Sequence, residues 1–153
     1  MKRFLSILFT VLALALEIFA KGAVGIYGPA PGMHVRVLYS YFSTVPFGYG
    51  MFPPLITAVL TVVLLILGFV AIKNRKAGIA LCILASATFI VSLLPLLYGR
   101  TGGYWYYSLV GLAISLALLL SAYFAIWAMV RKKPPKPAGP PPGVNPPPPP
   151  PAK

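Results

Sequence analysis

The chain has 153 residues, of which 59% are hydrophobic and only 9% are charged. A soluble domain ordinarily carries about 25% charged residues. A soluble chain of this length could not bury so much apolar surface, so the composition indicates an integral membrane protein. The net charge of +12 does not indicate nucleic-acid binding, because the basic residues cluster at the ends of apolar runs rather than on a folded basic face.

Few side chains could carry catalysis or bind a metal ion. The chain has one cysteine, Cys82, one histidine, His34, and one acidic residue, Glu17. These cannot assemble an internal disulfide, a typical zinc or calcium site, a pair of catalytic carboxylates or a Ser–His–Asp triad. We therefore expect a protein that is not an enzyme and that needs no cofactor or metal.

Four apolar runs predict an all-α integral membrane protein, folded as a four-helix transmembrane bundle over residues 1–133. The expected helices are about 4–24, 53–72, 77–98 and 108–130, with outer loops at 25–52 and 99–107. A spanning helix needs about 20 mainly apolar residues, and the first run reaches that length only if the helix continues past Lys21. The same run begins like a signal peptide, but Ile18 is not the small residue that a cleavage site requires. We expect an uncleaved helix.

Each expected helix has a stripe of small or hydroxylated residues at helical spacing. In lipid, helices associate through close packing of small residues and through side-chain hydrogen bonds, so these stripes predict one compact bundle. An alternative is that they line a pathway. The stripes are Ser6, Thr10, Ala13, Glu17 and Ala20; Thr57, Thr61 and Gly68; Gly78, Cys82, Ala85 and Ser92; and Ser108, Gly111, Ser115, Ala122 and Ala125.

The basic residues predict the orientation of the chain. With a cytoplasmic N-terminus, ten of the 13 lysines and arginines lie in inner segments. The other three, Lys21, Arg36 and Arg100, lie in outer segments. The positive-inside rule then places both termini in the cytoplasm, and we expect the plasma membrane.

The outer loops are rich in aromatic residues. Tyr104, Trp105, Tyr106 and Tyr107 form a candidate outer aromatic surface, which is typical of an interfacial aromatic belt. The alternative is a platform for an aromatic ligand or a glycan. In the first loop, residues 34–41 partly alternate in polarity, which predicts a short strand pair or an interfacial segment.

Residues 134–153 form a proline-rich tail that we expect to be disordered, because proline cannot form a helix interior or a central strand. Polyproline II is the expected conformation. The tail is either a solvated extension or a docking segment for a cytoplasmic polyproline-binding partner. The candidate docking residues are Pro146, Pro147, Pro148, Pro149, Pro150 and Pro151.

Glu17 and Lys21 form a candidate intramembrane ionisable site. A glutamate four residues before a lysine on one helix is the favourable orientation for an ion pair, which gives Glu17 a structural interpretation. An ionisable residue within a membrane span is also, by default, a candidate functional site. As the only acid, Glu17 could hold a proton or a cation.

These observations predict a multi-pass membrane protein of non-enzymatic structural or interaction type, acting as a subunit of a larger membrane assembly. The alternative is a small transporter or channel component that uses Glu17 for proton or cation coupling. The expected partners are the lipid bilayer and either another membrane protein or a polyproline-binding protein, without nucleic acid.

Overall fold

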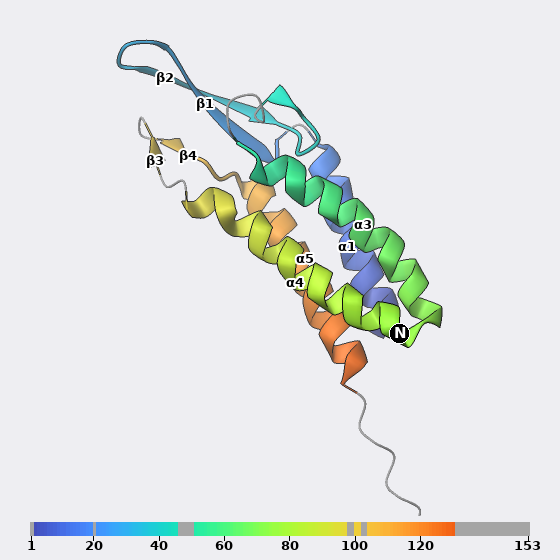
Figure 1. Ribbon diagram of the computed structural model, residues 1–153. Coiled ribbons are helices and arrows are strands. Elements are labelled where there is room, and N and C mark those ends of the chain that lie inside the picture. The colour runs from blue at the N-terminus through green and yellow to red at the C-terminus, as the bar shows by residue number, and fades with distance from the viewer. Residues whose placement is uncertain (1, 20, 46–50, 98–99, 102–103, 131–153) are drawn as a thin grey trace, which may run out of the picture.

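The computed structural model describes residues 2–19, 21–45, 51–97, 100–101 and 104–130. Its helices are α1 (Lys2–Ile18), α3 (Pro53–Lys73), α4 (Arg75–Leu97) and α5 (Leu109–Met129). Its strands are β1 (Ala23–Ala30), β2 (Met33–Tyr39), β3 (Arg100–Thr101) and β4 (Tyr104–Trp105). The helices alternate in direction, so the N-terminus and the end of α5 share one end of the bundle and the strands lie at the other (Figure 1).

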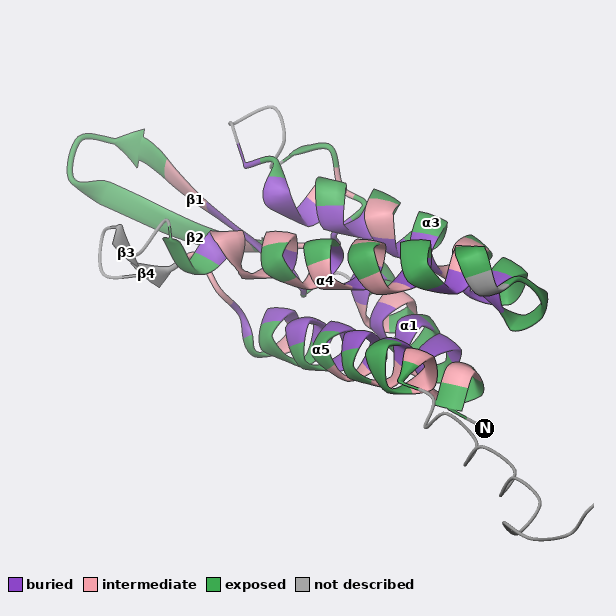
Figure 2. Ribbon diagram, turned by 60° about the horizontal axis from the view of Figure 1, so that its bottom comes forward, coloured by how far each residue is buried: buried purple, intermediate pink, exposed green. Residues whose placement is uncertain are grey.

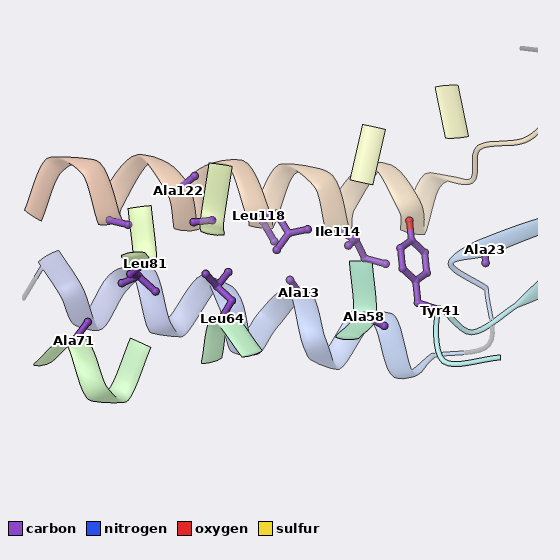
Figure 3. Packing of buried hydrophobic residues seen from close by; sticks show 13 residues of the cluster. Ala13, Ala23, Tyr41, Ala58, Leu64, Ala71, Leu81, Ile114, Leu118 and Ala122 are labelled. Atoms are coloured by element: carbon purple, nitrogen blue, oxygen red, sulfur yellow. The ribbon is translucent and has the colours of Figure 1, made fainter. Parts of the chain in front are cut away.

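The helices form a ring in which α1 packs against α5 and α3, and α4 packs against α3 and α5. Each helix turns its buried residues inward and leaves its outer face exposed (Figure 2). Small side chains alternate with a few large ones in the core, as in the neighbourhood of Ala13, Ala58, Leu64 and Leu118 (Figure 3). The alanines bring the helix backbones close together, which is how helices associate when the surroundings are as apolar as the side chains.

Among the described residues, three helices are long and apolar enough to cross a membrane: α3, α5 and the part of α4 from Lys76 to Leu97. They lie at nearly the residues predicted from the apolar runs. The first prediction was wrong at its end, because α1 stops at Ile18 and does not reach residue 24. At 1.5 Å per residue, its 17 residues measure about 26 Å, less than the ~30 Å hydrocarbon core of a typical bilayer.

Helix α1 ends where backbone hydrogen bonds from later residues replace the helical pattern. The main-chain N–H of Tyr41 donates to the carbonyl oxygen of Glu17 at 3.0 Å, and that of Lys21 donates to Phe19 at 2.8 Å. The first of these bonds satisfies a carbonyl group that the last helical turn leaves without a partner. From Ala23 the chain is extended and pairs with β2, so sheet pairing overrides the apolar pattern that predicted a longer helix.

The segment predicted as the first outer loop is largely a β-hairpin. Strands β1 and β2 pair antiparallel, with Ala23 opposite Tyr39 and Tyr27 opposite Val35. Gly32 lies in the turn between them with a φ of 78°, a conformation that glycine adopts without steric cost. The strand predicted within residues 34–41 is confirmed as β2, whereas its partner β1 was expected to be partly helical. The second outer loop contains the short pair β3 and β4.

The predicted helix stripes are confirmed as inward-facing. All of their described members are buried except Cys82, which is half-buried, and Ala20 lies outside the described residues. The small residues therefore serve the packing of a closed bundle, as the close contacts of Gly68 illustrate. A Cβ atom added at Gly68 would lie 3.0 Å from Ile7 Cγ1, so α1 and α3 approach each other where α3 has no side chain.

We expect Gly68→Leu to destabilise the bundle by about 1–3 kcal/mol, because the added carbons overpack the contact between α1 and α3. Thermal unfolding of the detergent-solubilised chain measures this loss. Phe69→Leu is the matched control, since Phe69 is exposed on the outer face of the same helix. Equal losses at the two positions would show that α3 does not present Gly68 to α1.

Candidate functional site at the hairpin end of the bundle

Glu17 lies in the last turn of α1 and faces α3, with no exposed surface. Its Oε1 accepts a hydrogen bond of 2.8 Å from the hydroxyl of Thr61. The same hydroxyl also lies 2.9 Å from the carbonyl oxygen of Thr57, so its single hydrogen is shared between two acceptors. Among the described residues, the other carboxyl oxygen, Oε2, has no hydrogen-bond partner. The Glu17 carboxyl is thus buried and only half satisfied.

Lys21 does not complete this site. It lies in a turn beyond the end of α1 and is exposed, so the helical four-residue spacing to Glu17 no longer applies. Within the described part of the chain, no ion pair joins Lys21 to Glu17. The interpretation of the two residues as a helical ion pair was therefore wrong, and its physical cause is the early end of α1. Lys21 instead lines a surface pocket with Arg36 and the start of α5.

Tyr41 closes the bundle beside Glu17. Its side chain is only 2% exposed and points from the segment after β2 toward α5, beside Ile114 (Figure 3). Two glycines make room for it: a Cβ atom at Gly22 would lie 2.8 Å from Tyr41 Cδ2, and one at Gly111 would lie 3.3 Å from the Tyr41 hydroxyl. Tyr41 lies within the strand predicted at residues 34–41, but no sequence pattern indicated that its ring is buried at the end of the bundle.

Burial raises the pKa of the Tyr41 phenol above its ordinary value of 10.0, and the nearby Tyr107 and Glu17 raise it further. Burial likewise raises the pKa of Tyr107, although the hydrogen bond with Ser115 opposes that effect. Both phenols therefore remain protonated where an exposed tyrosine would ionise.

Within the candidate outer aromatic surface, the structure describes the side chains of Tyr106 and Tyr107. Tyr107 turns its hydroxyl into the bundle, where it bonds with Ser115 Oγ and donates to the carbonyl oxygen of Gly111 at 3.2 Å. Tyr106 is half-buried. Tyr104 and Trp105 form β4, and their side chains are outside the described part of the structure. Tyr107 is thus a packing residue as well as a member of the predicted aromatic surface.

Several other buried hydroxyl groups pair between helices. Ser6 Oγ of α1 donates to the carbonyl oxygen of Ser121 in α5 at 3.0 Å, and Thr10 Oγ1 lies 2.8 Å from Ser121 Oγ. Ser92 of α4 donates to Ser115 of α5 at 3.0 Å. Interhelical hydrogen bonds of this kind stabilise transmembrane bundles by about 0.6 kcal/mol each on average. These groups therefore fasten helices together.

No metal site is evident in the described ranges, which contain no group of three or more His, Cys, Asp or Glu residues that could hold an ion. Cys82 is a half-buried free thiol in α4, and His34 is exposed in β2. The candidate docking residues Pro146 to Pro151 lie outside the described residues. Comparisons with protein-family models, with curated proteins and with solved structures found no match to this chain.

We expect the stability of the protein to fall above pH 10 through Tyr41. Below the pKa of the unfolded phenol, about 10, both states keep the proton, and this group contributes no pH dependence. Above it the unfolded chain releases the proton while folded Tyr41 retains it, so the free energy of unfolding falls by up to ~1.4 kcal/mol per pH unit. Unfolding curves of the solubilised protein between about pH 9 and pH 11.5 test this. Tyr41→Phe should flatten the alkaline decline, and an unchanged decline in this variant would contradict the buried phenol.

Proposed function

We propose that the chain is a multi-pass membrane protein of non-enzymatic structural or interaction type, a subunit of a larger assembly in the plasma membrane. Large apolar side chains are exposed on the outer faces of all four helices, among them Leu8, Ile66, Ile83 and Leu116. A soluble monomer rarely exposes contiguous apolar patches larger than a few hundred Å², whereas lipid accepts them at no cost. This distribution supports insertion of the bundle into a bilayer.

The proposed orientation places both termini in the cytoplasm and the hairpins outside. Lys2 and Arg3 begin α1, and Lys73 and Lys76 flank the turn between α3 and α4 at the same end of the bundle (Figure 1). This concentration of basic residues supports the orientation through the positive-inside rule. The tail at 134–153 is then cytoplasmic, where a polyproline-binding protein is its proposed partner.

The observation that carries the interaction role is a β-hairpin with a fixed base and an exposed tip. At the base, Ser108 Oγ donates to the carbonyl oxygen of Gly22 at 2.6 Å. In the middle of β2, Arg36 Nη2 donates to the carbonyl oxygen of Tyr107 at 3.2 Å. Beyond the base, Met33 is 62% exposed and Val35 is 47% exposed. Figure 2 shows the exposed part of the hairpin extending away from the helices. A surface of this kind suits contact with another membrane protein outside the bilayer.

We expect a photo-crosslinking amino acid in place of Val35 to give a protein adduct of one discrete mass in native membranes, because the hairpin tip is the proposed contact surface. Gel electrophoresis and mass spectrometry measure the adduct. The same amino acid in place of Ile66, which is 61% exposed on α3, is the control and should give lipid adducts only. The interaction role fails if position 35 gives no protein adduct, or only the products formed at position 66.

A second candidate function is supported by the half-satisfied carboxyl of Glu17. An oxygen without a partner inside a bundle can receive a proton or a cation, which is the chemistry that a coupled transporter needs. The surrounding groups support the structural role instead, because Thr61 binds the carboxyl and Tyr41 covers the end of the bundle beside it. A small transporter or channel component therefore remains the alternative.

The variant Glu17→Gln separates the two functions. Under the structural role, the amide oxygen of the introduced glutamine still accepts a hydrogen bond from Thr61, so we expect the unfolding free energy to change by no more than about 1 kcal/mol. The crosslink from position 35 should be unchanged. Neither the wild-type chain nor the variant should give proton flux in liposomes. A pH-sensitive dye inside the liposomes measures that flux, with protein-free liposomes as the control. Flux through the wild-type chain that Glu17→Gln abolishes would contradict the structural role and establish the transporter.

A further inference from the structure

A surface pocket of about 210 Å³ lies at the hairpin end of the bundle. It is smaller than the cavities of about 300–1,000 Å³ that enclose drug-sized ligands, and its size suits a single headgroup. Segments distant in the sequence meet there: the turn after α1, strand β2 and the start of α5. The lining residues are Lys21, Arg36, Leu38, Ser108, Leu109 and Val110.

The two cations of this pocket have no acidic partner in the described chain. Glu17 is the only acidic side chain in the sequence, and it is buried and bonded to Thr61. Arg36 uses one of its five N–H donors for the carbonyl oxygen of Tyr107, and the Lys21 ammonium is exposed. No acidic side chain is therefore available to neutralise this pair, which leaves it open to an anionic ligand.

The other side of the pocket is apolar and belongs to a candidate membrane span. Leu109 begins α5, one of the helices long and apolar enough to cross a bilayer, and its side chain is 86% exposed. Leu38 and Val110 lie beside it in the pocket lining. The two cations thus lie beside the start of α5. In the proposed membrane insertion, this start lies at the interface, where lipid phosphates meet acyl chains. The positive end of the α5 dipole adds to the same potential.

We propose that this pocket binds an anionic phospholipid, with the headgroup phosphate between Lys21 and Arg36 and an acyl chain along Leu109. Arginine binds phosphate through paired N–H donors, and lysine adds a compact positive charge. The proposal rests on membrane insertion, which is part of the proposed function, but it is independent of the protein partner and of the role of Glu17.

Native mass spectrometry of the full chain in detergent, with phosphatidylglycerol or phosphatidylcholine added, tests the site. We expect the chain to retain phosphatidylglycerol preferentially and the variant Lys21→Gln/Arg36→Gln to bind it about tenfold to thirtyfold more weakly. The matched control Lys73→Gln/Lys76→Gln removes the same charge at the other end of the bundle and should keep the preference. The single variant Lys21→Gln leaves the Arg36 bond to Tyr107 intact, and it should lose part of the preference without unfolding.

Three results would overturn the proposal, and they differ in what else they affect. Equal retention of the two lipids by a wild-type chain found in membranes removes the site but leaves the proposed function intact. Displacement of phosphatidylglycerol by inorganic phosphate identifies a site for a free anion instead of a lipid. A wild-type chain that is absent from the membrane fraction of cells overturns both the lipid site and the proposed function.

Discussion

Close approach of the helix backbones is the constraint on which the rest of this structure depends. Large apolar side chains occupy the outer faces of the helices, and small side chains make up much of the interior. Ala13, Ala58, Ala85 and Ala117 are each at most 3% exposed, and Gly68 leaves space for Ile7. At such short separations even the short side chains of serine and threonine reach a neighbouring helix, so packing and hydrogen bonding reinforce each other.

The buried hydroxyl groups accordingly bond to one another or to nearby carbonyl oxygens. Ser6 and Thr10 meet Ser121, and Ser92 meets Ser115, so these hydroxyls bind other parts of the chain. Glu17 stands apart because one of its oxygens has no hydrogen-bond partner among the described residues. A buried polar group without a partner is costly. The chain places its only acidic side chain in the last turn of α1, one residue before the end of the helix.

The two ends of the bundle are fastened differently. At the end that holds the N-terminus, Arg3 donates to the carbonyl oxygens of Ala71 and Ile72, which end α3, and the Lys2 ammonium lies 4.0 Å from the centre of the Trp127 ring. At the hairpin end, Tyr41 fills the space between α1 and α5, and Ser108 binds Gly22. The first end is thus fixed by cations, and the second by an aromatic ring and a hydroxyl.

Local patterns in the sequence were enough to predict a mostly helical chain, three of its helices and the residues that face inward. These features follow from local periodicity: an apolar run of about 20 residues indicates a span, and small residues at three- and four-residue spacing mark one helix face. The alternation near Val35 likewise predicted a strand. Each of these signals is carried by residues close together in the chain.

The end of α1, the partner of Glu17 and the position of Tyr41 were decided only by the tertiary structure. Residues 19–24 continue an apolar run, and the helix stops there because β1 pairs with β2 and Tyr41 binds the Glu17 carbonyl oxygen. That early end moves Lys21 away from Glu17 and into a pocket with Arg36. Thr61, 44 residues away in the chain, takes its place. Contacts over such separations depend on how the elements pack, and no local pattern encodes them.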